Sequence, residues 1–291
     1  MPYWVLSRKI GGGIDPLTVA ILLLFTAFFF SSPLQAQSRQ TVVIPGTGMF
    51  ERALRHVAKR FNEQSTRFRV EIPVSVGSGG GIRKVLAGEA SMARVGRPLN
   101  PKEKAQDSNL QWKLFAYDAV VFAVGRRVKV KQRSIDQLKA IFEGRSQRWE
   151  TVDGREPPIR VITREPGDAS LMVIQRHLLP FANYDPLKYG RMVFHDYEME
   201  AMLKKFGYAI SWGSLSTIQL GHSGAKPLAI GTMTPTLDQI VSGAYPLRGP
   251  CALVYNPEKL RGPERAFLSY LGKKGGRDAM REAGLVPLKV D

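Results

Sequence analysis

The chain has 291 residues and a formal net charge of +17, and 44% of its residues are hydrophobic while 23% are charged. This composition is ordinary for a globular protein, and the length is sufficient for a sizeable core and two lobes. A positive charge of this size favours acidic partners. However, the lysines and arginines are scattered along the chain, and no basic block is interleaved with aromatic residues. We therefore expect the charge to be solvated at the surface, and we expect no nucleic-acid partner.

The N-terminus has the three parts of a cleavable signal peptide. Arg8 and Lys9 provide a basic start, residues 17–30 are apolar, and residues 34–36 (Leu-Gln-Ala) form an acceptable cleavage site. The apolar stretch is too short for a comfortable transmembrane helix. We predict that residues 1–36 are a signal peptide that directs export to the periplasm, and an uncleaved membrane anchor is the alternative.

After residue 36, short apolar runs alternate with stretches of helical spacing, a pattern typical of an α/β fold. A capping box at Ser134 and a capping threonine at Thr236 mark two helix starts. We predict strands at residues 41–44, 68–76, 91–95, 114–124, 159–164, 207–212 and 226–230, and a further long strand that reaches residue 255. We predict helices that start near residues 50, 82, 134, 170, 236, 263 and 275. The first of them has Phe50, Leu54, Val57 and Phe61 on one apolar face.

Three corners between a strand and a helix contain small and hydroxyl-bearing residues. They lie at residues 45–50, 77–81 and 165–170. The start of a helix leaves backbone N–H groups without partners and carries the positive end of the helix dipole, so each corner can bind an anion. In open α/β sheets, ligands bind at the C-terminal ends of strands, where these corners fall. One such corner is more simply a tight turn, but three together predict a binding site.

Several short motifs occur in the order found in one known family. They are the segments 77–82, 88–93, 97–99, 116–121, 138–149, 207–210, 245–247 and 283–288. With them, the chain after residue 36 resembles the periplasmic phosphate-binding proteins of ABC importers. The resemblance implies a two-lobe, type II periplasmic-binding-protein fold, in which each lobe is a mixed sheet flanked by helices and crossover strands join the lobes. It places lobe 1 at 41–118 plus 245–291 and lobe 2 at 119–244.

The resemblance also implies which residues contact the ligand. Grouped by corner, they are Thr47, Gly48 and Met49, then Ser78 and Gly79, then Arg164, Asp168, Ala169 and Ser170. Arg164 would make charge-assisted hydrogen bonds to a dehydrated oxyanion.

Two positions depart from the family pattern. Many members carry an aspartate after the third strand, where it accepts the proton on phosphate and excludes sulfate, but Gly96 holds that place here. The third corner usually supplies a hydroxyl where this chain has Asp168. Both departures would be explained if Asp168 supplied the acceptor carboxylate in place of the missing aspartate. Such an acceptor would favour phosphate over sulfate, because sulfate has no proton to donate to it. Alternatively, Asp168 only caps its helix and the ligand differs.

Enzyme chemistry finds little support in the sequence. The four histidines lack the spacing of metal ligands, and the single cysteine, Cys251, lies in an apolar run that predicts a buried position and excludes an internal disulfide. The loop at Ser78 lacks the Gly-x-Ser-x-Gly pattern of hydrolases, and Glu51 replaces the third glycine of a dinucleotide loop. We therefore predict no catalytic activity, no metal and no cofactor. Tyr117 and Asp118 could reach the cleft, but hinge structure is the simpler interpretation.

The predicted function is capture of a small oxyanion, foremost phosphate, for an ABC importer. We expect a monomer that contacts the membrane only through the permease. The first alternative is an accessory protein of the same fold with an altered ligand or a protein partner. The second is a basic surface protein that binds polyanions.

Overall fold

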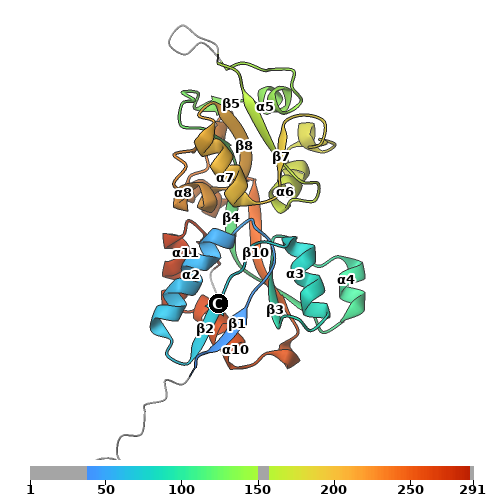
Figure 1. Cartoon of the computed structure of the whole chain (residues 1–291), viewed down its shortest axis with the longest axis vertical. Coiled ribbons are helices and arrows are strands. Elements are labelled where there is room, and N and C mark those ends of the chain that lie inside the picture. The colour runs from blue at the N-terminus through green and yellow to red at the C-terminus, as the bar shows by residue number, and fades with distance from the viewer. Residues whose placement is uncertain (1–37, 150–156, 289–291) are drawn as a thin grey trace, which may run out of the picture. The chain divides into compact units, whose positions relative to one another are not determined.

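In residues 38–149 and 157–288, which the computed structural model describes, a mixed nine-stranded sheet and a separate two-stranded sheet organise the fold (Figure 1). The predicted signal peptide lies outside the described residues. The strands are β1 (Gln40–Val43), β2 (Phe68–Glu71), β3 (Met92–Val95), β4 (Gln111–Val124), β5 (Gln132–Arg133), β6 (Arg160–Arg164), β7 (Arg191–Val193), β8 (Ala209–Ser214), β9 (Lys226–Ile230), β10 (Arg248–Tyr255) and β11 (Val286–Pro287).

Helices flank these strands, which confirms the predicted α/β class. They are α2 (Glu51–Gln64), α3 (Gly77–Leu86), α4 (Pro101–Gln106), α5 (Ile135–Phe142), α6 (Ala169–His177), α7 (Asp196–Lys205), α8 (Leu215–Leu220), α9 (Leu237–Ser242), α10 (Gly262–Gly272) and α11 (Lys274–Glu282). Two short 3-10 helices lie at Leu179–Phe181 and Pro257–Lys259. The capping bonds predicted at Ser134 and Thr236 are present.

The long strand β4 joins most of the large sheet. The strand order is β3-β10-β4-β8-β6-β7, and β9 and β11 also pair with β4. Residues 111–119 of β4 pair with β10, whereas residues 120–124 pair with β8. Figure 1 shows β4 and β10 side by side. The described chain from Arg39 onward is one compact unit, so the lobe bounds given above stay a prediction.

Two sequence predictions are wrong at the second corner. The strand predicted at 68–76 ends at Glu71, since β1 offers only four residues to pair with and Pro73 has no N–H to donate. The helix predicted near residue 82 begins at Gly77, so the glycines form its first turns rather than a loop. A Cβ on Gly81 would lie 2.8 Å from the Gly46 Cα, which explains why glycine stands there.

Two apolar clusters position the corners. The larger runs from β1 through β4 to β10 and α11, and it includes the predicted α2 face of Phe50, Leu54, Val57 and Phe61. A smaller cluster packs α3 on β3 and β10 through Ile82, Val85, Ala93, Val95, Leu110, Ala252 and Val254. Burial of Ile82 and Val85 fixes the start of α3 beside the end of β3. Cys251 is fully buried, as predicted.

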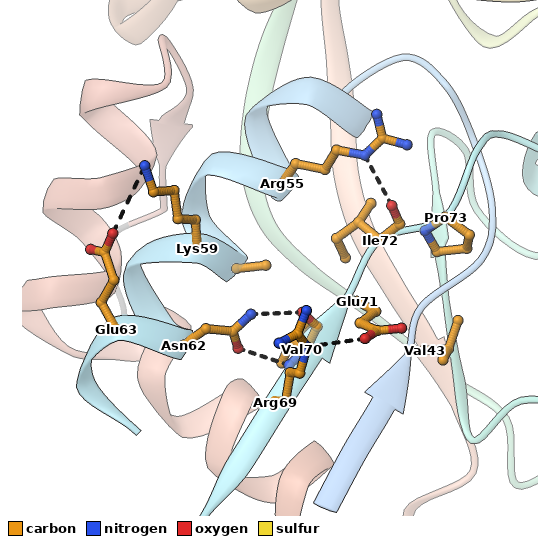
Figure 2. Close-up of a pocket in the computed structure, with 11 residues that line it drawn as sticks. Val43, Arg55, Lys59, Asn62, Glu63, Arg69, Val70, Glu71, Ile72 and Pro73 are labelled. Atoms are coloured by element: carbon orange, nitrogen blue, oxygen red, sulfur yellow. Dashed lines mark hydrogen bonds and ion pairs between the residues drawn. The ribbon is translucent and has the colours of Figure 1, made fainter. Parts of the chain in front are cut away.

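Side chains from α2 cover the free edge of β2. Asn62 donates to the Val70 carbonyl (2.9 Å) and accepts from the Val70 amide (2.8 Å), and the Arg55 Nε donates to the Ile72 carbonyl at 2.9 Å (Figure 2). These bonds occupy backbone groups at a strand edge that could otherwise pair with another chain. The groove of about 560 Å³ beside them contains no residue of the predicted site. Within the described ranges, every helix is too short or too polar to traverse a bilayer.

Candidate functional site

The three predicted corners meet around Gly96, at the end of β3. The Ser78 Oγ accepts a hydrogen bond from the Gly96 amide at 3.1 Å. A Cβ built on Gly96 would lie 2.9 Å from the Ala169 Cβ and 3.2 Å from the Met49 Cε. The second corner therefore contacts Gly96 directly, and the first and third corners pack against the same point. It follows that the starts of α2, α3 and α6 lie close together.

Arg94, a buried arginine of β3, holds the first corner in place. Its guanidinium donates to the carbonyls of Ile44, Thr47 (2.7 Å) and Pro73 (2.8 Å), and to the Glu51 carboxylate at 2.9 Å. Burial lowers the pKa of Arg94 to about 10, although Glu51 opposes that shift, so the side chain stays charged near neutral pH. Sequence reasoning missed this residue, because an arginine inside an apolar strand shows no sign of its partners.

The third corner forms because β6 ends at Arg164 and Asp168 starts α6. Gly167 supplies a positive φ of 83° in the intervening turn. The Asp168 Oδ1 accepts from the Leu171 amide at 2.9 Å and from the Trp212 Nε1 at 3.3 Å. The capping bond of Asp168 is therefore present, whereas both the proton-acceptor role and the alternative that Asp168 only caps the helix stay predictions.

Three carboxylates surround the buried guanidinium of Arg164. Asp196 accepts from its Nη1, the Asp168 Oδ2 lies 3.4 Å from its Nη2, and the Glu165 Oε2 lies 3.5 Å from its Nε. The Phe194 carbonyl accepts from Nη2 at 3.1 Å. Burial alone would lower the pKa of Arg164, but the three carboxylates raise it above its usual value. Burial raises the pKa of both Asp168 and Glu165.

Asp196 is the principal site residue that the sequence analysis missed. It is the first residue of α7, a helix for which we made no prediction. Its Oδ2 lies 3.0 Å from a Cβ built on Gly48, so this carboxylate links the first corner to Arg164 of the third. The His-Asp-Tyr-Glu sequence could have suggested a helix start, since the Glu198 carboxylate accepts from the amides of Phe194 and His195.

Buried side-chain polar atoms without a hydrogen-bond partner gather at this place. Within residues 38–149 and 157–288 they are Thr163 Oγ1, Arg164 Nε, Glu165 Oε2, His195 Nδ1 and Asp196 Oδ2. Buried polar groups are normally satisfied, and unsatisfied ones are costly. These unsatisfied atoms gather beside Arg164 and Asp196, where polar chemistry is concentrated.

A cavity of about 270 Å³ opens next to these atoms. It is lined by Gly48, Glu51, Arg52, Arg55, Ser75, His195, Asp196, Tyr197 and Thr217. Arg52 pairs with Glu200, and Arg55 pairs with Glu51 at 2.7 Å. Of the nine predicted ligand residues, Gly48 alone lines this cavity.

The other predicted ligand residues do not line this cavity. Thr47, Met49, Arg164, Asp168, Ala169 and Ser170 are all buried. Ser78 and Gly79 lie in the first turn of α3, where a Cβ on Gly79 would be 3.7 Å from the Arg97 guanidinium. The structure thus brings the predicted residues together, but it leaves most of them without direct access to the cavity.

Asp118 of β4 is a buried carboxylate close to the site. The Ser216 amide at the start of α8 donates to it at 3.2 Å, and the Ser216 hydroxyl donates as well. Burial raises the pKa of Asp118 to about 7, although the bonds from Ser216 oppose the shift. The side chain is fully buried between β4 and α8, which agrees with a structural role.

We expect the contribution of Asp118 to stability to fall as pH rises from about 4 to about 7. In this window the folded protein holds the Asp118 proton that the unfolded chain has lost, so this carboxyl alone lowers the free energy of unfolding by roughly 1.4 kcal/mol per pH unit. The measurement is urea unfolding across this range for the wild type and Asp118→Asn. The variant should lose this part of the slope, and equal slopes would contradict the expectation.

Comparisons with known proteins place the chain in a family. Residues 31–272 match the PBP superfamily domain. The phosphate-binding protein PstS of Borreliella burgdorferi is 22% identical over 285 residues, which cover 94% of this chain and 98% of the relative. PstS of Staphylococcus haemolyticus is 24% identical over 243 residues, which cover 79% of this chain and 77% of the relative.

Solved structures with this fold include transport proteins from two further bacteria. One is a Clostridium perfringens protein, assigned as a phosphate ABC transporter substrate-binding protein and solved with bound phosphate (TM-score 0.74, 20% identity, 86% of this chain and 100% of that chain). Another is an ABC-type phosphate transport receptor from Vibrio cholerae (TM-score 0.60, 21% identity, 84% and 99%). These similarities confirm the predicted fold class and the resemblance stated above. Because the matched domain spans most of its length, the chain belongs to the PBP superfamily.

Proposed function

We propose that this protein is an exported solute-binding protein that captures phosphate for an ABC importer. The observation that carries the proposal is the meeting of three helix starts around Gly96, with the buried Arg164 beside them. Helix starts offer backbone N–H donors and a positive potential, and arginine matches the geometry of an oxyanion. The names of the relatives, which are phosphate-binding proteins, support the same ligand.

Binding in this proposal is a closure that breaks no covalent bond. Donors from the first and second corners and from the third would replace the water around the anion, and the closed form would be favoured by its additional contacts. We propose that lobe 1 (41–118 plus 245–291) and lobe 2 (119–244) move against each other. We further propose that residues 1–36 are removed on export to the periplasm and that the mature monomer docks on the permease.

Gly96 leaves no space for the aspartate that many family members carry. A side chain there would meet Ala169 and Met49 at 2.9 and 3.2 Å, so the acceptor for a phosphate proton must come from elsewhere. Asp168 and Asp196 are the carboxylates nearest to the guanidinium of Arg164. This substitution also favours a second candidate, a protein of the same fold with an altered oxyanion ligand.

Isothermal titration with phosphate, sulfate and a polyanion, at low and high salt, tests the proposal. Saturable phosphate binding with little salt dependence is the expected result, because a dehydrated site is screened weakly. Binding of a different oxyanion would favour the second candidate. Polyanion binding that disappears at high salt would identify a surface-charge effect and contradict the proposal.

Asp168→Ser tests the proton-acceptor role of that carboxylate. Serine can still cap α6, so the fold should be kept, while the carboxylate beside Arg164 is lost. If Asp168 accepts the phosphate proton, competition by sulfate should rise by at least about tenfold, which corresponds to about 1.4 kcal/mol. An unchanged ratio of phosphate to sulfate affinity would leave Asp168 with the capping role alone.

A further inference from the structure

Asp196 separates Arg164 from the cavity. Its Oδ1 accepts from the Arg164 Nη1, and its Oδ2 is buried and has no hydrogen-bond partner. Asp196 lines the cavity and Arg164 does not. The same Oδ2 faces Gly48 of the first corner, where a Cβ would lie 3.0 Å away. One carboxylate therefore lies between the first and the third of the three corners that are expected to hold an anion.

We propose that Asp196 is an internal ligand of the anion site, and that an incoming oxyanion must displace it from Arg164. The inference rests on the proposed function and adds a residue that sets its affinity. A carboxylate satisfies a guanidinium much as a phosphate does, so the two compete for the same donors. The Asp196 side chain occupies the anion site until phosphate replaces it.

The other two carboxylates around Arg164 are poor candidates for displacement. Asp168 is held by the Leu171 amide, by the Trp212 indole and by the start of α6. Glu165 lies 3.5 Å from the Arg164 Nε without a hydrogen bond, and it does not line the cavity. Asp196 has a free oxygen and faces the cavity, so it can leave by rotating its side chain.

The start of α7 does not depend on the Asp196 side chain. The Glu198 Oε2 accepts from the amides of Phe194 and His195 at 2.9 and 3.2 Å, which ties the two residues before the helix to its first turn. Displacement of Asp196 would therefore leave the helix intact. For the same reason, Asp196→Asn should fold, and its amide oxygen can still accept from Arg164.

The size of the effect follows from the populations of the two states. If Asp196 occupies Arg164 in nine of every ten molecules, the apparent phosphate Kd is about ten times that of the unoccupied site. Asparagine carries no charge and binds a guanidinium far more weakly than a carboxylate does. With that occupancy, Asp196→Asn is expected to bind phosphate up to about tenfold more tightly than the wild type.

The experiment is isothermal titration of phosphate into the wild type, Asp196→Asn, Asp196→Ala, Glu165→Gln and Asp238→Asn. Glu165→Gln removes a charge beside the same arginine without opening the cavity side. Asp238→Asn removes a charge from the first turn of α9, away from the site. We expect both Asp196 variants to bind more tightly, Glu165→Gln to change the Kd by less than about threefold, and Asp238→Asn to match the wild type. Thermal unfolding of each variant verifies that it is folded.

Each other result overturns the inference in a recognisable way. If Glu165→Gln tightened phosphate binding as much as the Asp196 variants do, general charge repulsion would explain the effect of the Asp196 variants. Weaker phosphate binding by the Asp196 variants would make Asp196 a direct contact of the ligand rather than its competitor. Absence of phosphate binding by the wild type and by every variant would overturn the proposed function together with this inference, whereas wild-type binding that Asp196→Asn leaves unchanged would overturn the inference alone.

Discussion

Arg164→Met is expected to weaken phosphate binding severely and to destabilise the fold. The substitution removes the guanidinium that would hold the anion, and charged hydrogen bonds of this kind are worth about 1.5–3 kcal/mol each. With two such bonds to the ligand, phosphate affinity should fall by at least about 100-fold. The variant also leaves Asp168, Asp196 and Glu165 without their shared cation, at a cost on the order of 3–5 kcal/mol of stability.

Titration calorimetry and urea unfolding measure the two effects separately. Arg160→Met is the matched control, because Arg160 starts the same strand, is exposed and lies over the Phe206 ring 4.2 Å away. It should bind phosphate as the wild type does. Adding Asp196→Asn to Arg164→Met should recover part of the stability and none of the binding. Phosphate binding by folded Arg164→Met at wild-type affinity would show that the anion binds elsewhere.

Arg94→Lys is expected to lower stability by about 3–5 kcal/mol, although it keeps the positive charge. A lysine cannot reach the carbonyls of Ile44, Thr47 and Pro73 and the Glu51 carboxylate at once, because its ammonium lacks the planar fork of arginine. The melting temperature should fall by roughly 10 °C. Phosphate binding should weaken too, because the first corner loses the side chain that holds it.

Differential scanning calorimetry and hydrogen exchange of residues 44–49 check this prediction. Faster exchange there, with slow exchange kept in α6, would show that Arg94 positions the first corner specifically. Arg69→Lys, on an exposed part of β2, is the control and should have no effect. A melting temperature within about 2 °C of the wild type would contradict the assigned role of Arg94.

Local sequence features predicted the secondary structure and the corners well. The capping residues Ser134 and Thr236 and the apolar face of α2 are observed where the sequence placed them. These features involve neighbours within a few residues, whose geometry follows from helix and strand periodicity. The wrong helix start at the second corner has a different cause. Close packing of Gly81 against Gly46 keeps the glycines in a helix, and sequence spacing does not show that contact.

For a related reason, the sequence alone did not show which residues make up the site. Arg164 was identified through the family resemblance, but its partner Asp196 is 32 positions away on a helix that was not predicted. Arg94 reads as one more residue of an apolar strand until its four partners are seen. Ion pairs of this kind form between groups that lie close together in space, and their positions follow no periodic pattern along the chain.

The amino-acid sequence by itself determined the α/β class, the three small-residue corners and the family to which the chain belongs, since each depends on short-range patterns that survive in any context. Only the tertiary structure decided that the corners meet at Gly96, that three carboxylates surround Arg164, and that Asp196 stands between this arginine and the cavity. The reason is that ion pairing and burial depend on which distant segments the packed core brings within a few ångströms of one another.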